Sequence, residues 1–278
     1  MPDFSPYIVP ALRAAGAAGA IQRSLIGRTR VDYKRPQDPV TEADRSSEAT
    51  IIRILGDAFP GHAFLGEEGG QRGTADHTWV IDPLDGTHNY VHAFPWFAVS
   101  IALRHRDEIV CGVILNTMLR EVYVAERGAG AYAASVETPY EATDWTAVRS
   151  WRRIHVSPVT RLEDATLCTG FRHPVEPARL NLDHFTNLLV RAARIREIGS
   201  AALSLAAVAL GQMEGYWEIG PHAWDFAAGM LLVAEAGGRT TDLRGRPAGA
   251  DRGQILATNG AVHDHVVAVL AEGHSAID

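Results

Sequence analysis

Apolar residues recur along this chain with two different periods, and the alternation of the two predicts a layered α/β fold. Apolar stretches with helical spacing predict helices over residues 6–26, 42–58, 180–193, 200–211, 222–236 and 262–270. Short runs rich in β-branched and aromatic residues predict strands over residues 63–66, 78–81, 97–104, 109–115, 121–125, 165–170, 194–198, 214–219 and 255–258. Because such elements bury one face each, we expect them to pack as layers.

Two polar stretches interrupt this pattern. Residues 30–40 are polar and broken by proline, which predicts a loop. Residues 133–151 have no clear period and read as an insertion that forms a lid, a dimer contact or a surface loop. With no low-complexity linker in the chain, we expect a single domain over residues 1–278 with two tightly packed halves, about 1–150 and 151–278.

One apolar strand runs directly into an acidic turn. Residues 79–90 read WVIDPLDGTHNY, so two carboxylates, Asp82 and Asp85, follow the strand three residues apart. Pro83 cannot donate to a sheet, which predicts that the strand stops near Asp82. Gly86 permits close backbone approach, and a helical turn from Thr87 would offer free N–H groups. Carboxylates suit hard cations and free N–H groups suit phosphate.

Composition narrows the classes of function. The 278 residues are 46% hydrophobic with a formal net charge of −7, which favours a globular protein and argues against a nucleic-acid surface. The chain has no apolar run of membrane-spanning length and no secretory leader pattern. Its two cysteines, Cys111 and Cys168, lie in apolar contexts, which predicts core thiols in a reducing compartment. We therefore expect a cytoplasmic protein with no membrane or nucleic-acid partner.

Four carboxylates at the ends of apolar elements are candidate metal ligands: Glu67, Asp82, Asp85 and Asp225. Each has a structural alternative, as a solvated loop acid, a turn former or a helix-dipole partner. Asp44 has one as well, because Thr41-Glu42-Ala43-Asp44 has the form of a capping box. Together, buried carboxylates are costly unless cations neutralise them. An all-oxygen set indicates Mg²⁺, or Mn²⁺, rather than zinc. Of the twelve histidines, only His222 is expected near this site.

Four segments in this order and spacing resemble the inositol monophosphatase family of lithium-sensitive, magnesium-dependent phosphomonoesterases. They are DPVTEAD at residues 38–44, GEE at 66–68, WVIDPLDGTHNY at 79–90 and WDFAAGMLLVAEAGG at 224–238. The resemblance extends from about residue 34 to residue 259. It implies an αβαβα layered sandwich of the sugar-phosphatase type and a homodimer.

The resemblance also implies roles for individual residues. It implies a first Mg²⁺ held by Glu67, Asp82 and the carbonyl of Leu84, and a second held by Asp82, Asp85 and Asp225. A weaker third ion would be reached by Glu67 through water, with Lys34 nearby. The remaining implied roles are phosphate binding by Gly86 and Thr87, activation of water by Thr87 and Asp44, and contact with the leaving group by Gly199, Ser200, Ala201, Glu218 and Asp225.

These roles fit the chemistry of phosphate monoesters, whose uncatalysed hydrolysis is extremely slow. Charge neutralisation and positioning must then supply most of the catalysis, and we expect direct attack by water without a phosphoenzyme. Inositol monophosphate or a similar polyol phosphate is the leading substrate, with histidinol phosphate and fructose-1,6-bisphosphate as alternatives. Arg172 could attract a second phosphate. A metal- or phosphate-sensing regulator on the same fold is the alternative outside enzymes.

Overall fold

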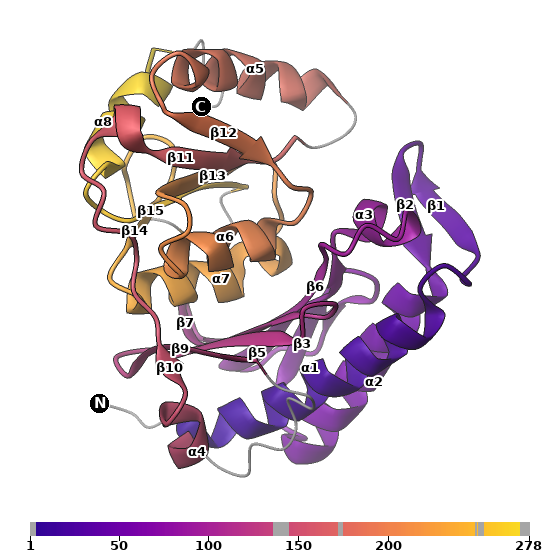
Figure 1. The fold of residues 1–278 in the computed structure, drawn as a ribbon. Coiled ribbons are helices and arrows are strands. Elements are labelled where there is room, and N and C mark those ends of the chain that lie inside the picture. The colour runs from indigo at the N-terminus through magenta and orange to yellow at the C-terminus, as the bar shows by residue number, and fades with distance from the viewer. Residues whose placement is uncertain (1–3, 136–144, 172–174, 248, 250–252, 273–278) are drawn as a thin grey trace.

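The computed structural model describes residues 4–135, 145–171, 175–247, 249 and 253–272, and its elements form five layers (Figure 1). Helices α1 (Ser5–Leu25) and α2 (Glu42–Ala58) cover the outer face of an eight-stranded sheet. Helices α6 (Ala201–Ala209) and α7 (Ala223–Glu235) lie between that sheet and a five-stranded one. Helices α5 (Val175–Leu189) and α8 (His263–Leu270) form the last layer. The predicted αβαβα sandwich is thus confirmed.

The large sheet has the strand order β10-β9-β8-β7-β6-β5-β3-β4. Its strands are β3 (Ala63–Gly66), β4 (Gly70–Arg72), β5 (His77–Asp85), β6 (Ala98–His105), β7 (Glu108–Asn116), β8 (Glu121–Glu126), β9 (Gly130–Ser135) and β10 (Arg152–Arg153). All neighbours pair antiparallel except β3 and β5, which are parallel. The antiparallel run from β5 to β9 agrees with the sequence prediction for β6, β7 and β8.

The small sheet has the order β12-β11-β13-β15-β14 and mixes both pairings. Its strands are β11 (Thr166–Thr169), β12 (Arg194–Glu197), β13 (Gly215–Ile219), β14 (Arg239–Thr241) and β15 (Gln254–Thr258). Strand β11 lies parallel to both β12 and β13, whereas β15 is antiparallel to its neighbours. The carboxyl ends of β11, β12 and β13 therefore meet at one edge, which faces the acidic turn of the large sheet.

Small residues let the central helices approach their neighbours closely. Every residue of α6 from Ala202 to Ala209 is buried, as its all-round apolar sequence predicts. A Cβ on Gly112 of β7 would lie 2.9 Å from the carbonyl oxygen of Ala228, so α7 packs directly on the sheet backbone. Both cysteines are free and buried. The layer of α6 and α7 packs against both sheets and so brings the edges of the two sheets close together.

Residues 30–40 form a hairpin, so the predicted loop is wrong there. Strands β1 (Val31–Arg35) and β2 (Asp38–Thr41) pair antiparallel around Gln37, whose φ is 67°. Pro39 pairs opposite Tyr33, and it is tolerated because both strands of a two-stranded sheet are edges. The hairpin is half exposed and has no apolar face that would have marked it as sheet.

The predicted insertion at residues 133–151 divides into three parts. Residues 133–135 continue β9, and residues 136–144 lie outside the described part of the chain. Helix α4 (Trp145–Arg149) packs against α1, with Val148 in the apolar cluster below the large sheet. Two short elements complete the structure: η2 (Leu162–Asp164), a 3₁₀ turn, and α3 (Thr87–Val91), the helical turn predicted from Thr87.

Candidate active site

A bulge in β5 places two acidic side chains on the same face of the sheet. Asp82 lies opposite Ser100 and Asp85 opposite Ala98, so three steps on β5 match two steps on β6. In a regular strand, residues three apart point to opposite faces. The extra residue of the bulge reverses that parity. The strand consequently continues to Asp85 rather than stopping near Asp82, because the bulge accommodates Pro83.

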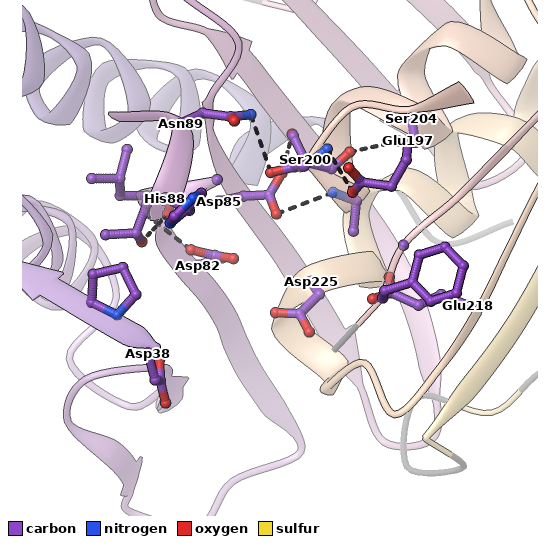
Figure 2. Close-up of a pocket in the computed structure, with 18 of the residues that line it drawn as sticks. Asp38, Asp82, Asp85, His88, Asn89, Glu197, Ser200, Ser204, Glu218 and Asp225 are labelled. Atoms are coloured by element: carbon purple, nitrogen blue, oxygen red, sulfur yellow. Dashed lines mark hydrogen bonds between the residues drawn. The ribbon is translucent and has the colours of Figure 1, made fainter. Parts of the chain in front are cut away.

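The acidic turn opens into a cavity of about 670 Å³ between the edges of the two sheets. Figure 2 shows Asp82 and Asp85 entering it from the large sheet and Asp225 and Glu218 from the other side. The predicted site residues that line it are Glu67, Asp82, Leu84, Asp85, Gly86, Thr87, Gly199, Ser200, Ala201, Glu218 and Asp225. Lys34 and His222 line an adjoining cavity of about 400 Å³ together with Glu67, Glu218 and Asp225.

Asp44 lies behind the cavity wall, where it is both a cap and a partner of Thr87. Its Oδ2 accepts hydrogen bonds from Thr41 N at 2.8 Å and Thr41 Oγ1 at 2.6 Å, which is the predicted capping box. Its Oδ1 accepts one from Thr87 Oγ1 at 3.0 Å. Burial raises the pKa of Asp44 above its usual range, although the bonds from Thr41 and Thr87 lower it in part. The carboxyl is therefore suited to exchange a proton with Thr87.

Asp85 connects the acidic turn to the start of α6. Its Oδ2 accepts hydrogen bonds from Ser200 Oγ and from Ala202 N at 3.0 Å, and its Oδ1 accepts one from Ala201 N at 3.2 Å. Ser200 also caps the helix, since its Oγ accepts from Leu203 N at 3.2 Å. Burial raises the pKa of Asp85 to about 6, against the lowering effect of the bond from Ser200.

Asp82 and Asp225 are the most strongly perturbed carboxyls of the cavity. Burial raises the pKa of Asp82 well above its ordinary value, and the charges of Glu67 and Asp85 raise it further. The same causes, burial first and Glu67 second, raise the pKa of Asp225. Asp225 is held at the first turn of α7, where its Oδ2 accepts from His222 N at 2.7 Å. Such mutual repulsion is what a bound cation relieves.

The four candidate ligands surround one cavity but do not converge on one point. Glu67 pairs with Lys34, whose Nζ lies 2.9 Å from Glu67 Oε1, and Lys34 also contacts Glu68. Asp85 is engaged with α6. Within the described ranges, no three acidic, histidine or cysteine side chains are gathered as a metal site. The donor set is nonetheless all oxygen, acidic and buried at Asp82 and Asp85, which suits a hard divalent cation.

Sequence reasoning missed several residues around the cavity. Tyr216 donates a hydrogen bond to Glu218, and Glu197 Oε1 accepts from Gly199 N at 3.2 Å. Asn89 Nδ2 donates to the carbonyls of Trp96 and Ile198 at 2.8 Å each. Further lining residues are Gln37, Asp38, His88, Thr169, Phe171 and Ser204. His88 and Asn89 directly follow Thr87 in α3, whereas the others come from separate strands and turns that only the tertiary fold brings together. Arg172 lies outside the described residues.

Comparison with known proteins agrees with this architecture. The model of the inositol monophosphatase family matches residues 3–275. Nus factor SuhB of Pseudomonas aeruginosa is 41% identical over 268 residues, covering 92% of both chains. Inositol-1-monophosphatase of Mesorhizobium japonicum is 38% identical over 255 residues, covering 91% of this chain and 90% of that one. The solved structure of inositol monophosphatase from Anabaena has a TM-score of 0.82 at 35% identity, with 96% of each chain covered.

The family model and the relatives together make this protein a phosphoric monoester hydrolase. The chain belongs to the inositol monophosphatase family, with the fold that this membership predicts. The family acts on small phosphorylated substrates, which a cavity of about 670 Å³ admits. Over the described residues, no helix is both long and apolar enough to cross a membrane.

Proposed function

We propose that this protein hydrolyses the phosphate monoester of inositol or a similar polyol with Mg²⁺ as cofactor. The observation that carries the proposal is the group of carboxylates around one cavity, in which Asp82, Asp85 and Asp225 have raised pKa values through burial and neighbouring charge. A dense negative site of this kind requires positive charge to work near neutral pH. Mn²⁺ could serve in place of Mg²⁺, and we expect two or three ions.

The cation sites are assigned to residues that already line the cavity. Glu67, Asp82 and the Leu84 carbonyl would hold the first ion, and Asp82, Asp85 and Asp225 the second. When bound, the ions would neutralise phosphate charge and lower the pKa of water. Glu67 would then exchange its pairing with Lys34 for a cation, and Lys34 would stay beside the site as a further positive charge. The amides of Gly86 and Thr87 would bind the phosphate.

Thr87 and Asp44 would orient the attacking water and take its proton. Thr87 Oγ1 donates to Asp44 Oδ1 at 3.0 Å and lies equally close to the Leu84 carbonyl. A proton that Thr87 accepts from water can therefore pass to Asp44, whose raised pKa allows it to hold one. Attack by water is direct, and no covalent phosphoenzyme forms.

The leaving alcohol would occupy the side of the cavity formed by the small sheet. Glu218 can accept hydrogen bonds from hydroxyls of a polyol, and its carboxylate already accepts one from the Tyr216 hydroxyl. Gly199, Ser200 and Ala201 form the adjacent wall at the start of α6. Histidinol phosphate and fructose-1,6-bisphosphate remain the competing substrates, because a cation and phosphate site on this fold does not by itself select the alcohol. Relatives of nearly equal identity are named either inositol-1-monophosphatase or Nus factor SuhB.

Phosphate release from a panel of substrates tests the proposal. The panel contains inositol-1-phosphate, histidinol phosphate, fructose-1,6-bisphosphate and 3′-phosphoadenosine 5′-phosphate, each with Mg²⁺ and with chelator. We expect Mg²⁺-dependent release with the highest kcat/KM for inositol-1-phosphate. A higher kcat/KM for another member would reassign the substrate, and release that survives chelation would refute the metal assignment. Light scattering with size exclusion would test the homodimer that we also expect from the family.

A further inference from the structure

A buried glutamate of α2 lies directly behind the turn that carries Glu67. Glu48 is only 3% exposed, and its Oε2 accepts a hydrogen bond from the backbone N–H of Glu68 at 2.8 Å. Glu67, Glu68 and Gly69 form the connection between β3 and β4, which pair from Gly66 and Gly70 outward. Glu48 therefore holds the inside of this turn from a different element of the fold.

The backbone of the turn is shaped to receive this carboxylate. A Cβ on Gly66 would lie 2.7 Å from Glu48 Cδ, and a Cβ on Gly69 would lie 2.7 Å from Glu48 Oε1. Real Cβ atoms essentially never approach so closely, so a Cβ at Gly66 would displace the Glu48 carboxylate, whereas one at Gly69 would meet the Arg72 guanidinium as well as Glu48. The carboxylate thus packs against the peptide backbone on both sides of Glu67 and Glu68. An acid that served only solubility would lie on the exposed face of the helix.

Glu48 and Asp44 lie one turn apart on the same face of α2. Asp44 bonds to Thr87 after the acidic turn of β5, and Glu48 bonds to the Glu67 turn after β3. Strands β3 and β5 are parallel neighbours, so both turns leave the same end of the sheet. One helix face consequently sets the relative position of two turns that supply cavity residues from adjacent strands.

We propose that Glu48 is a positioning residue that holds the Glu67 turn in place for cation binding. The inference rests on the proposed function, because it takes Glu67 as a cation ligand. Glu48 touches neither substrate nor cation in this assignment and acts only through the backbone of Glu68. Groups that orient metal ligands typically change metal affinity by about 10- to 100-fold when removed. Loss of Glu48 should accordingly weaken cation binding more than it changes substrate binding.

The test measures Mn²⁺ binding to the metal-free protein by calorimetry, together with the Mg²⁺ dependence of phosphate release. Glu48→Ala should weaken Mn²⁺ binding roughly tenfold and raise the Mg²⁺ concentration for half-maximal activity by a similar factor. The KM for substrate at saturating Mg²⁺ should change far less. Glu48→Gln keeps a carbonyl oxygen that can accept from Glu68 N, so it should restore Mn²⁺ binding to within about threefold of wild type.

Two further variants separate positioning from loss of stability. Ile51→Ala removes a buried side chain of α2 away from the turn and should lower the melting temperature without weakening Mn²⁺ binding. Gly66→Ala leaves Glu48 intact but crowds its carboxylate, and it should weaken Mn²⁺ binding as Glu48→Ala does. This glycine variant also tests the inference if Glu48→Ala does not fold.

Unchanged Mn²⁺ binding in Gly66→Ala and in any folded Glu48→Ala would overturn the inference. An equal loss of Mn²⁺ binding in Ile51→Ala would overturn the inference as well. Failure of the proposed function has a different signature, since wild-type protein would then show no Mg²⁺-dependent phosphate release.

Discussion

Asp85 and Ser200 are 115 residues apart in sequence, yet the Ser200 hydroxyl donates directly to the Asp85 carboxylate. The same carboxylate accepts from the first amides of α6, so it completes the helix start from outside the helix. Asp85 belongs to the large sheet and α6 to the layer between the sheets. This hydrogen bond therefore joins the large sheet to the middle helical layer at the wall of the cavity.

Removing the Ser200 hydroxyl should change both the free energy of unfolding and the pKa of Asp85. Ser200→Ala deletes the cap of α6 and should lower the free energy of unfolding by about 1 kcal/mol. It also removes a hydrogen bond that lowers the pKa of Asp85, so that pKa should rise further above about 6. Urea unfolding and NMR titration of the carboxyl would measure the two effects. Ser200→Thr keeps the hydroxyl and serves as the control that should lose neither.

Thr87→Ala tests the route by which water loses its proton. The variant lacks the hydroxyl that donates to Asp44, and we expect kcat to fall about 10²-fold or more. Cation binding should be nearly unchanged, because the proposed ligands remain. Steady-state kinetics together with Mn²⁺ titration would separate the two quantities. Thr87→Ser should retain most of the activity, and an unaltered kcat in Thr87→Ala would remove Thr87 from this role.

Asp82→Asn should abolish activity while making the metal-free protein more stable. Asp82 is fully enclosed, and burial followed by the charge of Glu67 raises its pKa, so the ionised form opposes folding when no cation is bound. A neutral amide removes that opposition, and the melting temperature of the metal-free variant should rise by about 2–4 °C. Mg²⁺ should then stabilise the variant much less than it stabilises wild type. Thermal unfolding with and without Mg²⁺ would measure both effects. If Asp82 were purely structural, the metal-free variant would melt at a lower temperature than metal-free wild type.

His263 predicts an acid-sensitive contribution to stability far from the cavity. Thr258 Oγ1 lies 2.9 Å from Nδ1 and Thr241 Oγ1 lies 2.9 Å from Nε2. Thr241 donates its own hydrogen to the Asp242 carbonyl, and the Thr258 hydroxyl accepts from Gly260 N. The fitting tautomer is neutral, with hydrogen on Nε2 and with Nδ1 accepting from Thr258. Burial accordingly lowers the pKa of His263 from 6.5 to about 4.

A lowered pKa means that the unfolded chain binds the proton more readily than the folded one. The contribution of His263 is complete above pH 6.5 and is lost as the pH falls towards 4. Urea unfolding at a series of pH values would measure it as a decline in the free energy of unfolding over that window. His263→Gln cannot titrate, so its curve should be flatter than that of wild type over this window, and the gap between the two curves should narrow as the pH falls. Parallel curves would contradict the assignment of a neutral imidazole.

The layered fold could be predicted from sequence where each element buries a distinct apolar pattern. Helix α6 is apolar all round because it lies between two sheets. The hairpin β1–β2 could not be predicted, because its half-exposed strands have neither a continuous apolar run nor an apolar face. The acidic turn and the chain segment around Asp225 were found because motif spacing is local. Glu48 could not be found in this way, because its partner is a backbone amide 20 residues away. The type of side chain at a position does not reveal a bond to a distant backbone amide.

The bulge between Asp82 and Asp85 means that the number of residues in this strand is as critical as their chemistry. Deleting Pro83 would allow β5 and β6 to pair without interruption, and the sheet would gain regularity. Asp82 and Asp85 would then stand two residues apart in a regular strand, so both carboxylates would still share one face of the sheet. A chain that kept the present three-residue spacing but lost the bulge would instead turn the second carboxylate through the sheet towards α2, so spacing and bulge must match for both acids to reach the cavity.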